Sequence, residues 1–240
     1  MSTPTSLDLP SRVRRITIHT SRGSFAALEA VPASGVCERD GALLIPGYTG
    51  SKEDFLAILD LLTDGSRQVV AIDMRGQFET PAAGDPDGYL VSELASDVAA
   101  ILQVTGARHL VGHSYGGLVA RETILADARL ASFTLMSSGP AALNGPRARE
   151  LRAMLAALGV RNGQLPDKTA LGDGISQLWR AQLEPQAVAA GVPAPIVAFL
   201  AKRMLSNDPN GLVLMARHML TAADRTAELA KLSQLPMLVI

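Results

Sequence analysis

The sequence predicts an α/β fold, with a mostly parallel sheet, helices on both faces, an N-terminal antiparallel hairpin and a helical cap inserted before the last strand present. Three observations predict it. An alternating pattern of apolar and polar residues opens the chain. Continuous apolar runs then alternate with amphipathic segments, which is typical of parallel strands covered on both faces. After residue 138 only helical patterns follow, up to about residue 224.

The hairpin is the first predicted element. Residues 13–30, VRRITIHTSRGSFAALEA, alternate apolar and polar side chains around the turn sequence SRG. Alternation with a period of two indicates half-buried strands, and a short turn joins two of them. We therefore expect an antiparallel edge to the sheet.

Strands and helices alternate in the stretch that follows. Each apolar run is short, whereas the segments between the runs have apolar residues at helical spacing. Gly106 supplies a stop for one of the helices. Strands are predicted at residues 41–48, 68–74, 109–114 and 131–138, and helices at residues 54–62, 90–106 and 115–127.

Helical patterns with no strand between them fill the next part of the chain. They lie at residues 147–159, 175–183, 194–206 and 211–224, and a last strand follows at residues 235–240. A helical excursion between two strands of a parallel sheet is typical of an inserted lid. The predicted division is an α/β core of residues 1–138 and 225–240, and a cap of residues 139–224.

The composition is that of one globular domain. The 240 residues are 48% hydrophobic and 19% charged with a net charge of -1, so no global field favours nucleic acid or an anionic membrane. The single cysteine, Cys37, excludes an internal disulfide and a multi-cysteine metal site. No apolar run has the length of a signal peptide or a membrane span. We expect a cytoplasmic protein without cofactor or metal that binds a small uncharged or weakly charged molecule, and the oligomeric state stays open.

The segment LVGHSYGG places a serine between a predicted strand and a predicted helix. Gly112-His113-Ser114-Tyr115-Gly116 fits the pattern G-x-S-x-G. A serine on so sharp a turn needs glycine two residues before and after it, because larger side chains would collide with the backbone. The N–H groups of the following helix face the negative charge that forms near the serine in acyl transfer. We predict that Ser114 is the catalytic nucleophile; a glycine-rich turn without chemistry is the alternative.

A second glycine-bearing loop, IPGYTGSKEDF at residues 45–55, directly follows an earlier strand. Acyl transfer needs two backbone donors for the oxyanion, and loops after neighbouring parallel strands meet at one edge of the sheet. The predicted oxyanion-hole donors are the backbone N–H groups of Tyr48 and Tyr115. The alternative is an ordinary turn with a helix start, in which Ser51 caps and Asp54 follows three residues later. Both interpretations can hold.

Together these blocks resemble the α/β-hydrolase fold family. LLIPGYTGS, VVAIDMRGQ, LVGHSYGG and PMLVI occur in the family's order, and the likeness covers about residues 13–240. The resemblance implies a nucleophile at Ser114 and oxyanion donors at Tyr48 and Tyr115. In the first block Pro-Gly stands where the family usually has His-Gly, which keeps the donor but loses a side chain that often supports the loop. The turn after Arg-Gly in the second block is also altered, so that loop is expected to have its own shape.

The base that activates the serine is not found at its expected place. The resemblance implies an acid after the strand that follows the cap and a histidine after the last strand, but the sequence stops at Ile240. On this interpretation the core is C-terminally incomplete. Asp73 is interpreted as a structural hydrogen-bonding residue at a strand end, and His113, whose side chain diverges from that of Ser114, as a packing or loop-supporting residue. His218 is interpreted as a solvated residue of a cap helix, with a rearranged base as the alternative.

The cap carries apolar side chains that either line a pocket over the serine or pack on the sheet and on each other. Methionines and a tryptophan among them favour an adaptable site for an acyl chain or a small hydrophobic ester. These residues are Leu151, Met154, Leu155, Trp179, Leu183, Phe199, Met204, Met215 and Met219. Arg147, Arg149 and Arg152 are interpreted as a solvated face, with a carboxylate-binding role as the alternative.

The predicted function is that of a serine hydrolase acting on a small to medium apolar carboxylic ester through an acyl-enzyme on Ser114. Acyl transfer, carbon-carbon bond hydrolysis and cofactor-free peroxidation on the same scaffold are alternatives, since fold does not fix chemistry. Epoxide and haloalkane hydrolysis are disfavoured, because the family members that perform them resemble this pattern with an aspartate where Ser114 stands. The non-enzyme alternative is a ligand-binding pseudoenzyme without a complete triad.

Overall fold

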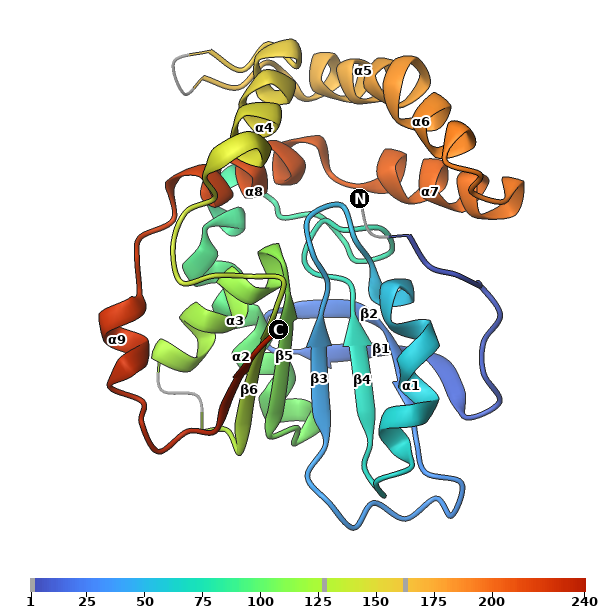
Figure 1. Cartoon of the computed structure of the whole chain (residues 1–240), viewed down its shortest axis with the longest axis vertical. Coiled ribbons are helices and arrows are strands. Elements are labelled where there is room, and N and C mark those ends of the chain that lie inside the picture. Colours follow the sequence, from blue (N-terminus) through green and yellow to red (C-terminus); the bar gives the residue numbers. More distant parts are fainter. Residues whose placement is uncertain (1–2, 127–128, 162–163) are drawn as a thin grey trace.

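A computed structural model of the chain describes residues 3–126, 129–161 and 164–240. Within these ranges a seven-stranded sheet has the order β1-β2-β4-β3-β5-β6-β7 (Figure 1). β1 pairs with β2 and β2 with β4 in antiparallel fashion, whereas the pairs from β4 to β7 are parallel. The strands are β1 (Val13–Thr20), β2 (Gly23–Ala30), β3 (Ala42–Ile45), β4 (Val69–Ile72), β5 (His109–His113), β6 (Ser132–Met136) and β7 (Met237–Val239). The predicted fold class and its N-terminal hairpin are confirmed.

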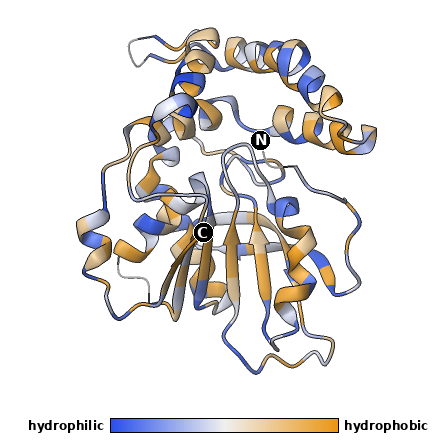
Figure 2. Cartoon of the chain, in the orientation of Figure 1, coloured by the Kyte–Doolittle hydropathy of each residue, from blue (hydrophilic) through white to orange (hydrophobic). Residues whose placement is uncertain are grey.

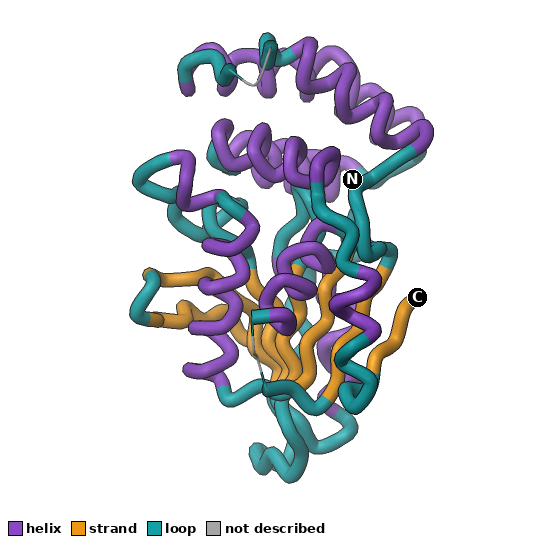
Figure 3. Tube along the Cα trace, turned by 90° about the vertical axis from the view of Figure 1, so that its left-hand side faces the viewer, coloured by secondary structure: helices purple, strands orange, loops and turns teal. Residues whose placement is uncertain are grey.

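Helices cover both faces of this sheet (Figure 3). α1 (Leu56–Thr63) follows the 3-10 turn η1 (Lys52–Phe55), and α2 (Val91–Thr105) follows the 3-10 turn η2 (Pro86–Tyr89). α3 (Tyr115–Leu125) comes after α2, and β5 lies between them in the chain. α2 ends at Gly106, whose left-handed φ of 68° makes the C-cap that the sequence predicts. The predicted helix at residues 115–127 ends at Leu125, and Asp127 lies outside the described residues.

The buried strand β3 shows how one run of residues serves both faces. Leu44 belongs to a buried cluster with Leu59 of α1, whereas Leu43 and Ile45 belong to a second cluster with Val98 of α2. All four residues of β3 are buried, and so are all four of β4. Burial on both faces explains why these strands are continuous apolar runs in the sequence, which Figure 2 shows in orange.

All but the last of the described helices between β6 and β7 lie together over one end of the sheet (Figure 1). They are α4 (Gly145–Ala157), α5 (Lys168–Leu178), the π-helical segment η3 (Trp179–Leu183), α6 (Glu184–Ala189), α7 (Ala194–Ser206) and α8 (Pro209–Thr221), and α9 (Thr226–Ala230) follows them. The predicted helix at residues 175–183 covers the end of α5 and all of η3, and α5 begins earlier, where the Asp167 side chain accepts bonds from the Thr169 and Ala170 N–H groups. The short helices α6 and α9 were not predicted. In the described ranges, no helix is long and apolar enough to cross a membrane.

The buried side chains of these helices join the larger cluster of the sheet. Leu171, Trp179 and Leu200 belong to the same cluster as Leu43 and Phe133 of the strands. The division into a core and a cap therefore stays a prediction, and we use the name cap for α4 to α8 only.

Candidate active site

Ser114 lies at the sharp turn between β5 and α3. Its backbone has φ 51° and ψ -117°, a combination that costs a non-glycine residue about 1–3 kcal/mol and persists only when surrounding contacts enforce it. The Ser114 N–H donates to the carbonyl of Met136 on β6 at 2.8 Å, and the Ser114 carbonyl accepts from the Gly117 N–H at 2.9 Å. These bonds hold the turn from both sides.

The glycines around Ser114 are required by close backbone contacts. A Cβ atom at Gly112 would lie 2.6 Å from the Gly116 carbonyl oxygen, and one at Gly116 would lie 2.6 Å from the Ile45 carbonyl oxygen of β3. A Cβ atom at Gly117 would lie 2.5 Å from Cβ of Ser138. No real Cβ atom is accommodated at such distances, so the G-x-S-x-G-G spacing is what allows α3 to start directly under the β3 and β6 loops.

Backbone strain gathers at the same edge of the sheet. Four non-glycine residues with positive φ, namely Thr49, Phe78, Ser114 and Ser137, lie in the loops that follow β3, β4, β5 and β6. Such residues cluster at functional sites, where the surrounding structure holds them in place. Ligands of open α/β sheets bind at the carboxyl ends of the strands, which is this edge.

The predicted oxyanion loop lies against the serine. A Cβ atom at Gly47 would lie 3.1 Å from both Ser114 Cβ and His113 Nδ1, so the peptide that carries the Tyr48 N–H passes beside Ser114. Within the described residues, no hydrogen-bond acceptor is found for the N–H of Tyr48 or Tyr115. Neither N–H group is therefore satisfied by another group of the described residues.

The helix start after this loop is present as well. Ser51 and Asp54 form the capping box of η1, in which the Ser51 N–H donates to Asp54 at 3.4 Å. The loop is thus both a helix start and a neighbour of Ser114, and the two interpretations of its sequence hold together.

Buried charges fix the far end of the loop. The Lys52 N–H donates to Asp73 Oδ1 at 2.8 Å, and Lys52 Nζ lies 2.7 Å from Asp73 Oδ2 and 2.7 Å from Glu79 Oε2. Burial raises the pKa of Asp73 to about 6, although Lys52 opposes the shift. Asp73 is therefore the structural residue that the sequence predicts. The partner was missed, because Lys52 looks like an ordinary solvated lysine in the sequence while its side chain is only 1% exposed.

A second buried ion pair joins the cap to this loop. Arg203 of α7 lies 2.6 Å from Asp54 Oδ1, and both side chains are buried. The phenyl rings of Phe78 and Phe199 pack edge to face beside it, with centroids 5.6 Å apart. These contacts have no signal in the local sequence pattern, since they join residues more than a hundred positions apart.

A cavity of about 440 Å³ opens beside Ser114, a volume within the usual range for small-molecule sites. Its described lining contains no charged side chain. It consists of Ser114, Tyr115, Leu118, Ser137, Ser138, Gly139, Ala141, Ala142, Leu143, Asn144, Met219 and Ile240. Of the nine apolar cap residues expected over the serine, Met219 lines this cavity, and most of the others pack in the larger buried cluster. Arg147, Arg149 and Arg152 are exposed and line no part of it.

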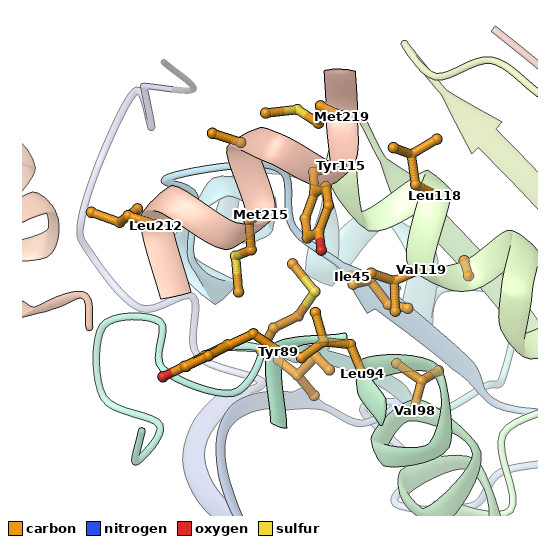
Figure 4. Packing of buried hydrophobic residues seen from close by; sticks show 14 of the residues in the cluster. Ile45, Tyr89, Leu94, Val98, Tyr115, Leu118, Val119, Leu212, Met215 and Met219 are labelled. Carbon is orange, nitrogen blue, oxygen red and sulfur yellow. The ribbon is translucent and has the colours of Figure 1, made fainter. Parts of the chain in front are cut away.

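Tyr115 connects this cavity to the cap. Figure 4 shows its ring among Met215 and Met219 of α8 and Ile45 of β3. Its hydroxyl lies 3.1 Å from His218 Nδ1, and the two rings are stacked with an interplanar angle of 15°. His218 is therefore not the solvated helix residue that we expected.

Neither histidine near the serine is bonded to it. Burial, and secondarily Arg217, lowers the pKa of His218. Burial also lowers the pKa of His113, whose ring lies against Gly47 in the loop-supporting position predicted for it. In the part of the chain that the structure describes, no hydrogen bond joins a histidine to Ser114 Oγ.

A family model described as the alpha/beta hydrolase family matches residues 42–238. The chain belongs to the alpha/beta hydrolase family. A curated relative from Variovorax paradoxus, named "Putative carbamate hydrolase RutD", is 37% identical over 107 residues, which are 43% of this chain and 40% of the relative. The match with this relative thus spans two fifths of its length.

Solved structures of this alpha/beta hydrolase fold superpose over nearly the whole chain. Epoxide hydrolase A from Mycobacterium thermoresistibile is 19% identical with a TM-score of 0.64, over 95% of this chain and 81% of that one. The esterase EaEST from Exiguobacterium antarcticum is 16% identical with a TM-score of 0.64, over 94% of this chain and 80% of that one. At these identities the likeness shows the shared fold.

Proposed function

We propose that the protein is a serine hydrolase that acts on a small to medium, uncharged acyl substrate, in the first place a carboxylic ester. The observation that carries the proposal is Ser114 itself, which is held at φ 51° and ψ -117° beside a cavity of about 440 Å³. The N–H groups of Tyr48 and Tyr115 are the proposed oxyanion donors. The absence of charged residues from the described cavity lining favours a neutral substrate.

The proposed chemistry is acyl transfer in two steps. Ser114 Oγ attacks the carbonyl carbon as its proton passes to a general base, and the carbonyl oxygen becomes an oxyanion that accepts bonds from the two N–H groups. The bond to the alcohol then breaks, the alcohol takes a proton, and the acyl group remains on Ser114 as an ester. Water attacks this ester and releases the carboxylic acid. In this scheme Ser114 is the nucleophile, and the backbone N–H groups of Tyr48 and Tyr115 are the oxyanion donors.

The solved neighbours and the curated relative are named for different reactions. Epoxide opening is not proposed, because Ser114 stands where the family's epoxide hydrolases have an aspartate. Carbamate hydrolysis is the second candidate, because the curated relative is named for it and because Ser137, Ser138 and Asn144 in the cavity lining offer partners to a carbamate nitrogen. Comparing matched nitrophenyl ester and carbamate substrates distinguishes the two.

A fluorophosphonate probe tests the nucleophile. We expect labelling of the wild-type chain, and a loss of roughly 10⁴-fold or more in Ser114→Ala, because no other group replaces the nucleophile. Ser138→Ala is the matched control, since it removes a serine that lines the same cavity, and it should remain labelled. Labelling that survives in Ser114→Ala removes the proposal. Reversible binding of the probe without labelling would favour the pseudoenzyme alternative, and labelling that also needs His218 would assign the base to the cap.

A further inference from the structure

The side chain of Gln77 is buried behind the oxyanion loop. It lies in the loop after β4, is 1% exposed, and donates from Nε2 to the carbonyl oxygen of Gly47 at 3.0 Å. Its Oε1 accepts from the Met74 N–H at 3.2 Å. Because Oε1 has a backbone N–H as its partner, the amide cannot be flipped without turning an oxygen toward the Gly47 carbonyl, so its orientation is determined by these bonds.

The bonded carbonyl belongs to the peptide unit that carries the Tyr48 N–H. In a planar trans peptide the C=O and the N–H point in opposite directions, so fixing one fixes the other. The Gly47 oxygen accepts a second bond from the Gly50 N–H at 3.0 Å. Rotation of this peptide plane would break both bonds and leave the buried Gln77 amide without an acceptor, which is unfavourable because a buried donor without a partner loses its hydration for no bond in return.

We infer that Gln77 is a positioning residue, which holds the Gly47–Tyr48 peptide with its N–H directed to the oxyanion site at Ser114. The inference rests on the proposed function, in which the Tyr48 N–H is an oxyanion donor. It also accounts for the departure in the loop sequence: Pro46 stands where the family usually has a histidine that supports the loop, and here the support comes from a different loop.

The cap holds Gln77 in place from both sides. The carbonyl of Gly76 accepts from the Asp208 N–H at 2.8 Å, and the Phe78 N–H donates to Asn207 Oδ1 at 3.3 Å. Asn207 and Asp208 form the joint between α7 and α8. Hydrogen bonds therefore connect Asn207 and Asp208 of the cap to the residues on either side of Gln77, and Gln77 to the Gly47–Tyr48 peptide. The cap thus helps to hold the Tyr48 N–H in place, and Met219 of α8 also lines the cavity.

Gln77→Glu tests the inference, because it keeps the size and the acceptor for Met74 but replaces the donor by an oxygen. We expect the limiting rate of fluorophosphonate labelling at Ser114 to fall about 10- to 100-fold, since a misplaced oxyanion donor acts on the transition state. The probe concentration for half-maximal rate should stay within about twofold, because ground-state binding does not use this N–H. As the pH falls, the introduced carboxyl gains a proton and a donor, so the variant-to-wild-type rate ratio should rise. Gln77→Met, which has no donor at any pH, should show the loss without the rise.

Thr80→Val is the matched control in the same loop. Thr80 Oγ1 donates to the Asp73 carbonyl at 2.9 Å and accepts from the Ala26 N–H at 2.9 Å, without contact to Gly47. Thr80→Val should lower the thermal midpoint of unfolding and leave the limiting rate of labelling within about twofold of the wild-type rate. Equal rate losses in Thr80→Val and Gln77→Glu would overturn the inference in favour of a general structural role. If Gln77→Glu and Gln77→Met both keep the wild-type limiting rate and labelling still depends on Ser114, the positioning role of Gln77 is wrong and the proposed function still holds. Labelling independent of Ser114 overturns both.

Discussion

The turn at Ser114 depends on the absence of side chains at its flanking glycines. Gly112→Ala would bring a Cβ atom to 2.6 Å from the backbone of Gly116 and Gly117, and neither backbone can move without displacing the start of α3. We expect the unfolding free energy to fall by about 1–3 kcal/mol, and labelling at Ser114 to fall with it. Urea unfolding and probe labelling measure the two effects.

Gly84→Ala is the control for this prediction. Gly84 has no atom within 4 Å of an added Cβ and no left-handed φ, so the same chemical change there should alter neither quantity. An unchanged labelling rate in Gly112→Ala would mean that the turn can relax, and that the tight packing of the elbow is not needed for its reactivity.

The residues that the sequence could identify are those whose role depends on near neighbours. Ser114 was predictable because glycines within three positions of it and the strand before it are all visible in one stretch. Gln77 and Lys52 were not, because their partners Gly47 and Asp73 lie 30 and 21 positions away. Nothing in the local pattern distinguishes a glutamine that holds a peptide plane from one that faces water.

At the scale of elements, the contact of α8 with α3 carries a titratable group. His218 is held half-buried against Tyr115, and its pKa is lowered because burial, and then Arg217, disfavours the charged form. Below the ordinary value of about 6.5 the unfolded chain therefore binds more protons at this position than the folded chain. The contribution of His218 to the unfolding free energy is present above that pH and is lost as the pH falls.

His218→Gln should flatten this dependence, because glutamine can still pair with the Tyr115 hydroxyl but does not titrate. We expect the drop in unfolding free energy between pH 7.5 and pH 5.5, the range of about one unit on either side of the ordinary histidine pKa, to be smaller in the variant than in the wild type. Urea titrations at the two pH values measure it. His19→Gln is the control, since His19 is exposed on β1 and bonds only locally to Ser24. If the unfolding free energy of His218→Gln drops as much as that of the wild type between the two pH values, groups other than His218 cause the pH dependence.

Elements with strong periodic patterns were predicted more accurately than those between them. α7 begins and ends as expected at residues 194–206, because Pro193 and the apolar spacing mark its start and face. Of α5 only the end was predicted, and α6 was missed, because the chain continues through the π-helical turn at Trp179 and then into a helix that begins at Glu184 with a proline in its first turn. The order of the strands follows from the handedness and pairing of the whole sheet, and the local pattern does not contain it.

At the scale of the whole molecule, the cap and the sheet share their buried residues. Leu171, Trp179 and Leu200 lie in one apolar cluster with Leu43 and Phe133. A cap that could fold alone would need a separate core, and the ion pair from Arg203 to Asp54 adds a buried contact across the boundary. We therefore expect the cap and the sheet to unfold together.

The single tryptophan makes this prediction measurable. Trp179 is 3% exposed in the cap, so its emission reports unfolding of the cap, whereas far-ultraviolet circular dichroism reports helices and strands throughout. In urea the two transitions should coincide within error, which is the test of a two-state change. Arg203→Met should lower both midpoints together, because it leaves the buried Asp54 carboxylate without its guanidinium, at a cost of about 3–5 kcal/mol. A red shift of Trp179 emission at lower urea than the loss of dichroism would show instead that the cap opens as an independent unit and that the shared cluster divides at the predicted boundary.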